Sequence, residues 1–238
     1  MTMQRLDPRL ECAAQFVRPG AVFADIGTDH AYLPIALLQR GAISYAYAAD
    51  VAQGPLATAK EHLDACAMED VTLYSRIALV LTDGLQGLET RTPEITDIAV
   101  CGMGGELIAR ILGDAPFVYH PAIRLILQPM TMQPYLRRWL CGEGFETESE
   151  RLCRTANGKL YSVICCHYTG VKTACGNTDA LFGAALLADP ENRPLLPEYL
   201  RANAERLARI VRGKREAGLP CCEEEEALAR AESLLRDM

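Results

Sequence analysis

The sequence predicts an α/β domain with a mostly parallel, doubly wound sheet, followed by a helical hairpin. Apolar runs bounded by turn residues recur at the spacing of βαβ units from Val22 to Gln128, which predicts parallel strands joined by helices. Two β-rich segments then flank the turn sequence Ala156-Asn157-Gly158, which predicts an antiparallel pair. After Tyr168 the apolar pattern is helical only, so we expect the sheet to end there.

The predicted elements follow in order along the chain. Parallel strands are expected at Val22–Ile26, Tyr45–Asp50, Ile77–Leu81, Ile95–Cys101 and Ile123–Gln128. Helices before, between and after them are expected at Leu6–Val17, Leu33–Arg40, Pro55–Ala67, Glu106–Leu112 and Met132–Cys141. The antiparallel pair is expected at Glu146–Cys153 and Lys159–Tyr168. A dinucleotide-binding sheet would normally continue with a sixth parallel strand, so the predicted sheet differs from it.

The segment after the sheet is expected to be a separate helical region. Its helices are expected at Leu181–Leu187, Leu195–Ala217 and about Glu223–Arg236. The last two are separated only by Gly218-Leu219-Pro220, and helices joined by so short a turn pack antiparallel, as in a two-stranded coiled coil. We therefore divide the chain into a catalytic-type domain at residues 1–170 and a recognition or assembly element at residues 171–238.

Composition restricts the class of protein. The 238 residues are 50% hydrophobic and 23% charged, which is typical of a globular protein. The longest apolar runs, such as Ala184–Ala188, are far shorter than the roughly 20 residues of a membrane span. The N-terminal segment Met1–Arg18 lacks the basic-then-apolar order of a secretory signal. We expect a cytoplasmic protein without a membrane partner.

Cysteine spacing argues against both disulfides and a metal site. The ten cysteines include the adjacent pairs Cys165-Cys166 and Cys221-Cys222, and no Cys-x-x-Cys sequence occurs. Reduced thiols in a reducing compartment are the simpler interpretation, and no metal is expected.

Charge is unevenly distributed along the chain. The net charge of −7 excludes a globally basic coat for nucleic acid but leaves room for a local patch. Between Arg193 and Arg215, seven basic residues face two acidic ones, a local excess of five. The alternative is a solvated helix face with i,i+4 ion pairs such as Glu205–Arg209.

The most informative motif joins the first predicted strand to its helix. Residues 25–34 read DIGTDHAYLP. In open α/β sheets ligands lie beyond the carboxyl ends of the strands, where a glycine allows close approach of the backbone. The motif lacks the glycines of a dinucleotide fingerprint and the Gly-Lys-Ser/Thr of a phosphate-binding loop. It resembles the first motif of class I S-adenosylmethionine methyltransferases with the second glycine replaced by Asp29, whose charge would repel a pyrophosphate but not a cationic cofactor.

Three further strand ends carry residues suited to ligands. Asp50 ends the second strand and could accept both ribose hydroxyls of an adenosine cofactor, while Asp83 follows the third and could bind the adenine amine. Both could instead be ordinary turn residues. The fourth strand ends in Gly102-Met103-Gly104-Gly105, where glycines allow close approach of a flat substrate or of a sulfonium. Four consecutive strand ends of this kind are difficult to obtain from a purely structural sheet.

Together these segments resemble the bacterial tRNA (adenine(22)-N1)-methyltransferase family over nearly the whole chain. The resemblance is carried by DIGTDHAYLP, Asp50–Leu56 with His62, Asp83-Gly84-Leu85, Gly102–Ile108 and Leu127-Gln128-Pro129. The first and fourth segments are the most specific. The resemblance implies a Rossmann-like class I methyltransferase domain with a coiled-coil-like helical tail, S-adenosyl-L-methionine as cofactor and tRNA as substrate. Two departures are Met130, where the family pattern leads us to expect Asn, and the acidic run Glu223–Glu226 in the tail.

The resemblance also implies the roles of individual residues. Cofactor contacts are expected from Asp25, Gly27, Asp29, Asp50, Val51, Asp83, Gly84, Gly102 and Met103. Contacts with the target nucleotide are expected from His30, Tyr32, Gly104, Gly105, Gln128 and Pro129. From their spacing alone, contacts with tRNA phosphates are expected from Arg206, Arg209, Arg212 and Arg215, which lie three residues apart and would form a slowly drifting stripe along one helix.

Asp29 is the candidate catalytic residue. A carboxylate near the exocyclic amine of adenine would stabilise the positive charge that develops on the ring during methylation and could take an amine proton. The alternative is that Asp29 caps the N-terminus of the following helix. His30 could contact phosphate or orient Asp29, or could simply pack, and Tyr32 could stack on a flipped base or belong to the core.

Three functional classes remain open from the sequence. An RNA methyltransferase explains both the strand-end motifs and the basic helix. A methyltransferase acting on a small molecule or a protein would leave the basic face at Arg201–Arg215 without a purpose. A non-catalytic RNA-binding adaptor would lose cofactor residues first, and here they are intact.

Overall fold

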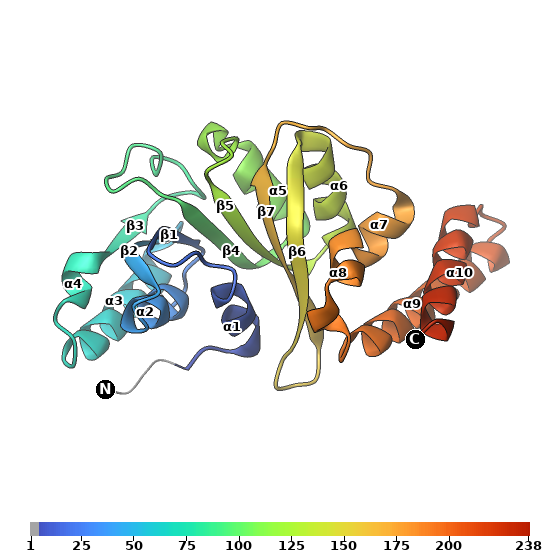
Figure 1. Ribbon diagram of the computed structural model, residues 1–238, viewed down its shortest axis with the longest axis horizontal. Helices are drawn as coiled ribbons and strands as arrows, with labels where there is room; N and C mark the ends of the chain where they lie inside the picture. Colours follow the sequence, from blue (N-terminus) through green and yellow to red (C-terminus); the bar gives the residue numbers. More distant parts are fainter. Residues whose placement is uncertain (1–4) are drawn as a thin grey trace.

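The computed structural model describes residues 5–238, which form a seven-stranded sheet with helices on both faces and a helical hairpin at one end (Figure 1). The strands are β1 (Ala21–Ile26), β2 (Ile43–Asp50), β3 (Ile77–Leu81), β4 (Asp97–Gly104), β5 (Arg124–Thr131), β6 (Phe145–Arg154) and β7 (Leu160–Tyr168). Their order across the sheet is β3-β2-β1-β4-β5-β7-β6. Strands β1 to β5 are parallel, and β7 is antiparallel to both β5 and β6. The predicted fold class is confirmed.

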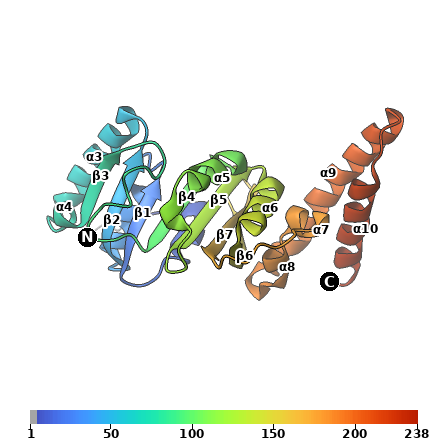
Figure 2. The same cartoon turned by 90° about the horizontal axis from the view of Figure 1, so that it is seen from above.

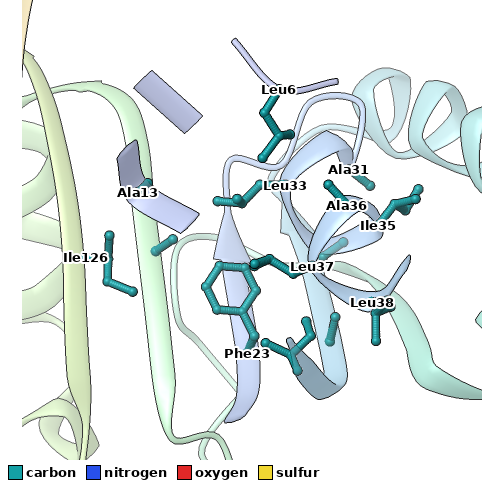
Figure 3. Close-up of a cluster of buried hydrophobic side chains, with 14 of the residues drawn as sticks. Leu6, Ala13, Phe23, Ala31, Leu33, Ile35, Ala36, Leu37, Leu38 and Ile126 are labelled. Atoms are coloured by element: carbon teal, nitrogen blue, oxygen red, sulfur yellow. The ribbon is translucent and has the colours of Figure 1, made fainter. Parts of the chain in front are cut away.

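Each strand contributes alternate side chains to two apolar cores, one on each face of the sheet. One face is covered by α1 (Pro8–Ala14), α2 (Tyr32–Gln39), α3 (Gln53–Ala67) and the short α4 (Leu73–Arg76). The other is covered by α5 (Gly105–Gly113) and α6 (Gln133–Glu143). Figure 3 shows Phe23 of β1 beside Leu37 of α2 in the first core. Because both faces are covered, the carboxyl edge of the parallel strands is the place left for a ligand.

The first helix is shorter than predicted. It begins at Pro8 because the Asp7 carboxylate accepts hydrogen bonds from the backbone N–H groups of Arg9 and Leu10, at 2.8 and 3.1 Å. Proline at the first helical position has no N–H to lose, so Asp7-Pro8 is a strong helix start. This start fixes where the side chain of Arg9 emerges.

The predicted helix Leu181–Leu187 is wrong as a single element. The structure has α7 (Asn177–Phe182) and α8 (Ala184–Ala188), separated by Gly183 with φ +78°. A Cβ atom on residue 183 would lie 2.6 Å from a carboxylate oxygen of Glu150. Only glycine fits this position, because the backbone is left-handed and passes directly over a buried carboxylate.

The tail has a core of its own. Helices α9 (Leu196–Glu216) and α10 (Cys222–Arg236) form an antiparallel hairpin that projects from the β6 end of the sheet (Figure 2). Apolar residues of α7 to α10 pack together with a single strand residue, Leu152 of β6. The buried side chain of Asn192 ties this region to β6, since its amide bonds to the backbone of Leu152 and Glu150 at 2.7 Å each.

All ten cysteines lie in the described part of the chain and are free thiols. No helix within residues 5–238 is long and apolar enough to cross a membrane. Over the same range, no group of three or more His, Cys, Asp or Glu side chains could hold a metal ion.

Candidate active site

The carboxyl ends of the five parallel strands meet at one edge of the sheet. Ile26 at the end of β1 pairs with Ala49 of β2 on one side and with Val100 of β4 on the other. Asp50 pairs with Leu81, the last residue of β3. The predicted ligand motifs, which follow these positions in the sequence, are therefore neighbours in space.

Asp25 is buried at this edge. Asp25 is only 5% exposed, and the Thr28 hydroxyl donates a hydrogen bond of 2.6 Å to its carboxylate. The pKa of Asp25 is raised to about 6, chiefly by burial; the hydrogen bond from the Thr28 hydroxyl lowers it and the nearby charge of Asp50 raises it. No arginine or lysine within residues 5–238 forms an ion pair with this carboxylate. A buried carboxylate without a cationic partner is suited to a cationic ligand.

The carboxylate of Asp25 lines a cavity of about 360 Å³ at the ends of β1, β4 and β5. The cavity brings together seven of the predicted site residues: Asp25, Gly27, Asp29, His30, Tyr32, Gly102 and Gln128. Gly27 has φ +73°, and a Cβ atom there would collide with the methyl group of Met103. The positive φ favours glycine at this turn, whereas the contact is with the flexible end of the Met103 side chain.

Asp29 does not cap a helix, so that alternative is wrong. The N-cap of α2 is Ala31, which makes no side-chain hydrogen bond. Asp29 and Ala31 are both left-handed, with φ of +46° and +54°. The Asp29 side chain is instead 73% exposed at the mouth of the cavity, with a carboxylate oxygen 3.5 Å from Nε2 of His30. Left-handed backbone at non-glycine residues is costly and occurs preferentially at functional sites.

Arg9 and Asp7 line the same cavity and were not predicted as site residues. The Arg9 guanidinium bonds to the Asp7 carboxylate at 2.8 Å and lies 3.5 Å from Oε1 of Gln128 and 3.2 Å from the sulfur of Met130. Asp7-Pro8 could have located the start of this helix from the sequence. Nothing local indicates that the helix packs beside the ends of β4 and β5.

Gln128 joins the ends of β4 and β5. Its side chain is fully buried, accepts a hydrogen bond of 3.1 Å from the backbone N–H of Gly102, and donates to the carbonyl of Pro129 at 3.2 Å. Both ends of the amide are thus used within the protein. Gln128 therefore positions the Gly102 loop, and its contact with the target nucleotide stays a prediction.

Comparison with known proteins identifies the family. A family model described as a methyltransferase domain matches residues 6–164. A tRNA (adenine(22)-N(1))-methyltransferase of Bacillus subtilis (strain 168) is 35% identical over 164 residues, which are 69% of this chain and 66% of that protein, slightly under two thirds of its length. A candidate tRNA (m1A22) methyltransferase of Streptococcus pneumoniae, known from a crystal structure, is 31% identical with a TM-score of 0.80, covering 97% of this chain and 100% of that one. The chain belongs to the tRNA (adenine(22)-N1)-methyltransferase family.

Two further structures of the family bear on the site. The B. subtilis tRNA (m1A22) methyltransferase is 28% identical with a TM-score of 0.71, and the match covers 98% of both chains. The S. pneumoniae protein has also been solved in complex with S-adenosyl-L-methionine, at 30% identity and a TM-score of 0.76 over 95% of this chain and 98% of that one. The sequence-based assignment to this methyltransferase family is confirmed.

The rings of His30, Tyr32 and His62 form a cluster, and His30 and Tyr32 line the cavity that Asp25 lines. His30 and Tyr32 are stacked with centroids 4.9 Å apart, and Tyr32 meets His62 edge-on at 4.8 Å. The ring nitrogen Nδ1 of His62 lies 2.8 Å from the carbonyl oxygen of His30. Tyr32 is 38% exposed, so the alternative that it belongs to the core is wrong.

The remaining strand-end residues lie outside the cavity that Asp25 lines. Asp50 is half-buried and accepts a hydrogen bond of 2.9 Å from the backbone N–H of Ala52, while Val51 is 67% exposed. Asp83 and Gly84 line a separate cavity of about 80 Å³. A Cβ atom on Gly84 would lie 3.2 Å from Ile111 of α5, so this glycine also serves the packing of α5.

Gly105 has a packing role as well. A Cβ atom there would lie 2.5 Å from the carbonyl oxygen of Met132, in the segment that joins β5 to α6. Gly104 is the N-cap of α5. These glycines allow α5 to begin directly against the neighbouring segment, which is a requirement of the fold beside their predicted contact with substrate.

The four tail arginines are all exposed on α9, where each step of three residues turns the side chain by about 60° around the helix, so the expected stripe drifts around it. Arg206 lies beside a groove that faces the sheet domain, and Arg215 bonds to the Glu225 carboxylate of α10 at 2.7 Å. Arg209 and Arg212 are exposed and form no ion pair within residues 5–238, so the alternative Glu205–Arg209 pair is also absent there.

Proposed function

We propose that this chain transfers the methyl group of S-adenosyl-L-methionine to ring nitrogen N1 of adenine 22 in tRNA. The observation that carries the proposal is the buried, unpaired carboxylate of Asp25 in a cavity at the strand edge, in a chain whose relatives are named for this reaction. A cationic cofactor without phosphate fits such a cavity better than a nucleotide does, since Asp25 and Asp29 would repel a pyrophosphate.

The residues present fit the cofactor. When bound, S-adenosyl-L-methionine supplies an electrophilic methyl group on a sulfonium. Asp25 would face its cationic part, Gly27 and Gly102 would leave room for it, and Asp50 would accept the ribose hydroxyls. Asp83 would lie near the adenine, at the end of β3 beside Asp50.

The chain has little chemistry to perform beyond alignment. N1 of adenine is already a neutral nucleophile with an in-plane lone pair, so the protein must hold the base against the methyl group. The Asp29 carboxylate, exposed at the mouth of the cavity, would stabilise the charge that appears on the adenine ring. The exposed ring of Tyr32 offers a surface on which an extruded base could stack.

We further propose that residues 1–170 are the catalytic domain and residues 171–238 a tRNA-binding domain. The separate apolar core of helices α7 to α10 supports this division, and the exposed Arg209 and Arg212 support the role in tRNA binding. A cytoplasmic location follows from a tRNA substrate.

Transfer of a labelled methyl group tests the proposed function. The full-length protein is incubated with labelled S-adenosyl-L-methionine and unmodified tRNA, and the labelled nucleotide is mapped. We expect 1-methyladenosine at position 22 and no label in tRNA that carries guanosine there. Label at another nucleotide, or no transfer to tRNA by protein that binds the cofactor, would contradict the proposal.

Replacing Asp50 with alanine is expected to weaken cofactor binding by roughly 1–3 kcal/mol, because two charge-assisted hydrogen bonds to ribose are lost. Calorimetric titration with S-adenosyl-L-methionine measures the effect. Asp50→Asn is the matched control, since it keeps the acceptor for the Ala52 N–H but removes the charge. If the folded alanine variant binds the cofactor as tightly as the natural protein, Asp50 is only a turn residue.

Cofactor affinity is expected to fall below pH 6. Asp25 must be ionised to attract a cation, and its pKa of about 6 means that acid protonates it while most other carboxylates stay charged. The dissociation constant should therefore be about tenfold larger at pH 5 than at pH 7.5. Asp25→Asn should bind weakly at both pH values and show little of this dependence. An equally steep dependence in that variant would assign the titration to another group.

A further inference from the structure

A second and larger hollow lies beside the proposed methyl-transfer cavity. It is a groove of about 900 Å³ between the sheet domain and the tail. It is lined by the end of β5 with the start of α6, by the turn between β6 and β7 with the start of β7, by Leu181 of α7 and by the first turns of α9. The groove is therefore built jointly by the two parts of the chain that the proposed function assigns to chemistry and to recognition.

The groove and the cavity meet at Arg9. The guanidinium of Arg9 lines the cavity, lies 3.2 Å from the sulfur of Met130 in the groove, and lies 5.8 Å from the ring centroid of Tyr161, which also lines the groove. A polymeric ligand with one of its units in the cavity could thus continue directly into the groove.

The charge of the groove is positive. Arg138, Lys159 and Arg206 are exposed in its lining. Arg138 and Arg206 bond only to the neutral side chains of Asn177 and Asn203, and Lys159 forms no ion pair within the described residues, so all three charges remain available.

The one acidic residue of the lining is already neutralised. The Glu198 carboxylate forms a two-point ion pair with the Arg154 guanidinium of β6, with distances of 2.8 and 2.5 Å. The groove therefore presents three uncompensated positive charges, which is the charge expected for contact with phosphates.

Apolar surface is exposed beside these charges. Met132 and Tyr135 line the groove and are 46% and 43% exposed, which is high for side chains of this size. Met132 is left-handed, with φ +58°, a costly conformation for a methionine. Aromatic surface next to cations is what single-stranded nucleic acid requires, because bases stack on rings while phosphates contact the charges.

We infer that this groove binds the RNA strand immediately flanking the target adenine. Arg138, Lys159 and Arg206 contact its phosphates, Tyr135 and Met132 receive a flanking base, and Arg9 stands where the strand turns into the cavity. The inference rests on the proposed function and adds the path of the substrate to it. The path uses the inward side of α9, whereas Arg209 and Arg212 point elsewhere and would contact a different part of the tRNA.

Charge reversal in the groove tests the path. The full-length variant Lys159→Glu/Arg206→Glu should bind unmodified tRNA at least about tenfold more weakly than the natural protein. The slope of log affinity against log salt concentration should also become shallower, by about one for each phosphate contact that is lost. Its dissociation constant for S-adenosyl-L-methionine should be unchanged. Lys60→Glu is the control for a charge reversal away from the groove, since Lys60 is an exposed residue of α3, paired with Asp64, at the other end of the sheet, and it should leave tRNA binding within about twofold.

Tyr135→Ala tests the stacking surface separately. It should weaken tRNA binding by about fivefold or more without changing the salt dependence, because a ring and not a charge is removed. Tyr135→Phe should restore binding. If either groove variant is too unstable to assay, Lys159→Gln and Arg206→Gln replace it. A shallower salt dependence of tRNA affinity in these two variants then supports the path, and an unchanged one contradicts it.

The outcomes separate this inference from the proposed function. If the natural protein methylates adenine 22 but the groove variants bind tRNA with natural affinity and salt dependence, the path is wrong and the function stands. If the natural protein binds no tRNA, both are wrong. If Lys60→Glu loses as much tRNA binding as the groove variant, the effect of charge is not specific to the groove, and the path is wrong.

Discussion

Replacing Glu150 with alanine is expected to destabilise the protein by about 3–5 kcal/mol, because the change leaves the Arg137 guanidinium buried without a counter-charge. The two side chains are 1% and 6% exposed and are joined by bonds of 2.5 and 3.0 Å. Arg137 also donates to the backbone carbonyls of Ala180 and Leu181, at 2.6 and 3.1 Å. The pair therefore anchors α7 to the sheet domain, and we expect its loss to loosen the tail first.

Urea denaturation of the natural protein and of Glu150→Ala measures this effect. The matched control is Glu11→Ala, which breaks the ion pair between Glu11 and Arg40, whose side chains are 44% and 28% exposed. That change should cost less than about 1 kcal/mol, since water screens the pair and solvates the remaining charge. The double variant Arg137→Met/Glu150→Leu should recover most of the loss, because it removes both charges. Equal losses in Glu150→Ala and Glu11→Ala would show that the buried pair contributes no more than a surface one.

The sequence predicted the sheet well because its signals are local. Each parallel strand is an apolar run with turn residues at its end, and the ends of parallel strands must share an edge. The neighbourhood of Asp25, Asp50 and Gly102 could therefore be predicted from their order in the chain. Family resemblance added the identity of the ligand, which periodicity alone does not contain.

The parts that escaped prediction depend on long-range packing or on backbone conformation. Arg9 reaches the cavity only because α1 packs beside β5, far away in sequence. The break at Gly183 exists because the chain must pass over Glu150, and no local pattern records that contact. The left-handed conformation of Asp29 is likewise invisible in a sequence, although it decides whether the carboxylate caps a helix or faces a ligand.

The conformation of Asp29 also determines how its catalytic role should be tested. Alanine would remove the carboxylate but would also disfavour the left-handed backbone, which asparagine tolerates. Asp29→Asn is therefore the sharper variant. If the carboxylate stabilises charge on the adenine ring, this change should lower the rate of methyl transfer at least tenfold and by up to about 10³-fold, as for other contacts made in the transition state. Single-turnover kinetics with saturating tRNA and cofactor measures that rate.

Asp83→Asn provides the opposite expectation in the same assays. Asp83 is proposed to bind the adenine of the cofactor, so its variant should raise the dissociation constant for S-adenosyl-L-methionine and leave the rate at saturation nearly unchanged. Asp29→Asn should instead leave that dissociation constant within about threefold, because an interaction confined to the transition state does not contribute to ground-state binding. Equal losses of cofactor affinity and rate in Asp29→Asn would place its carboxylate against the cofactor, and the charge on the methylated base would then have to be stabilised by another group at the mouth of the cavity.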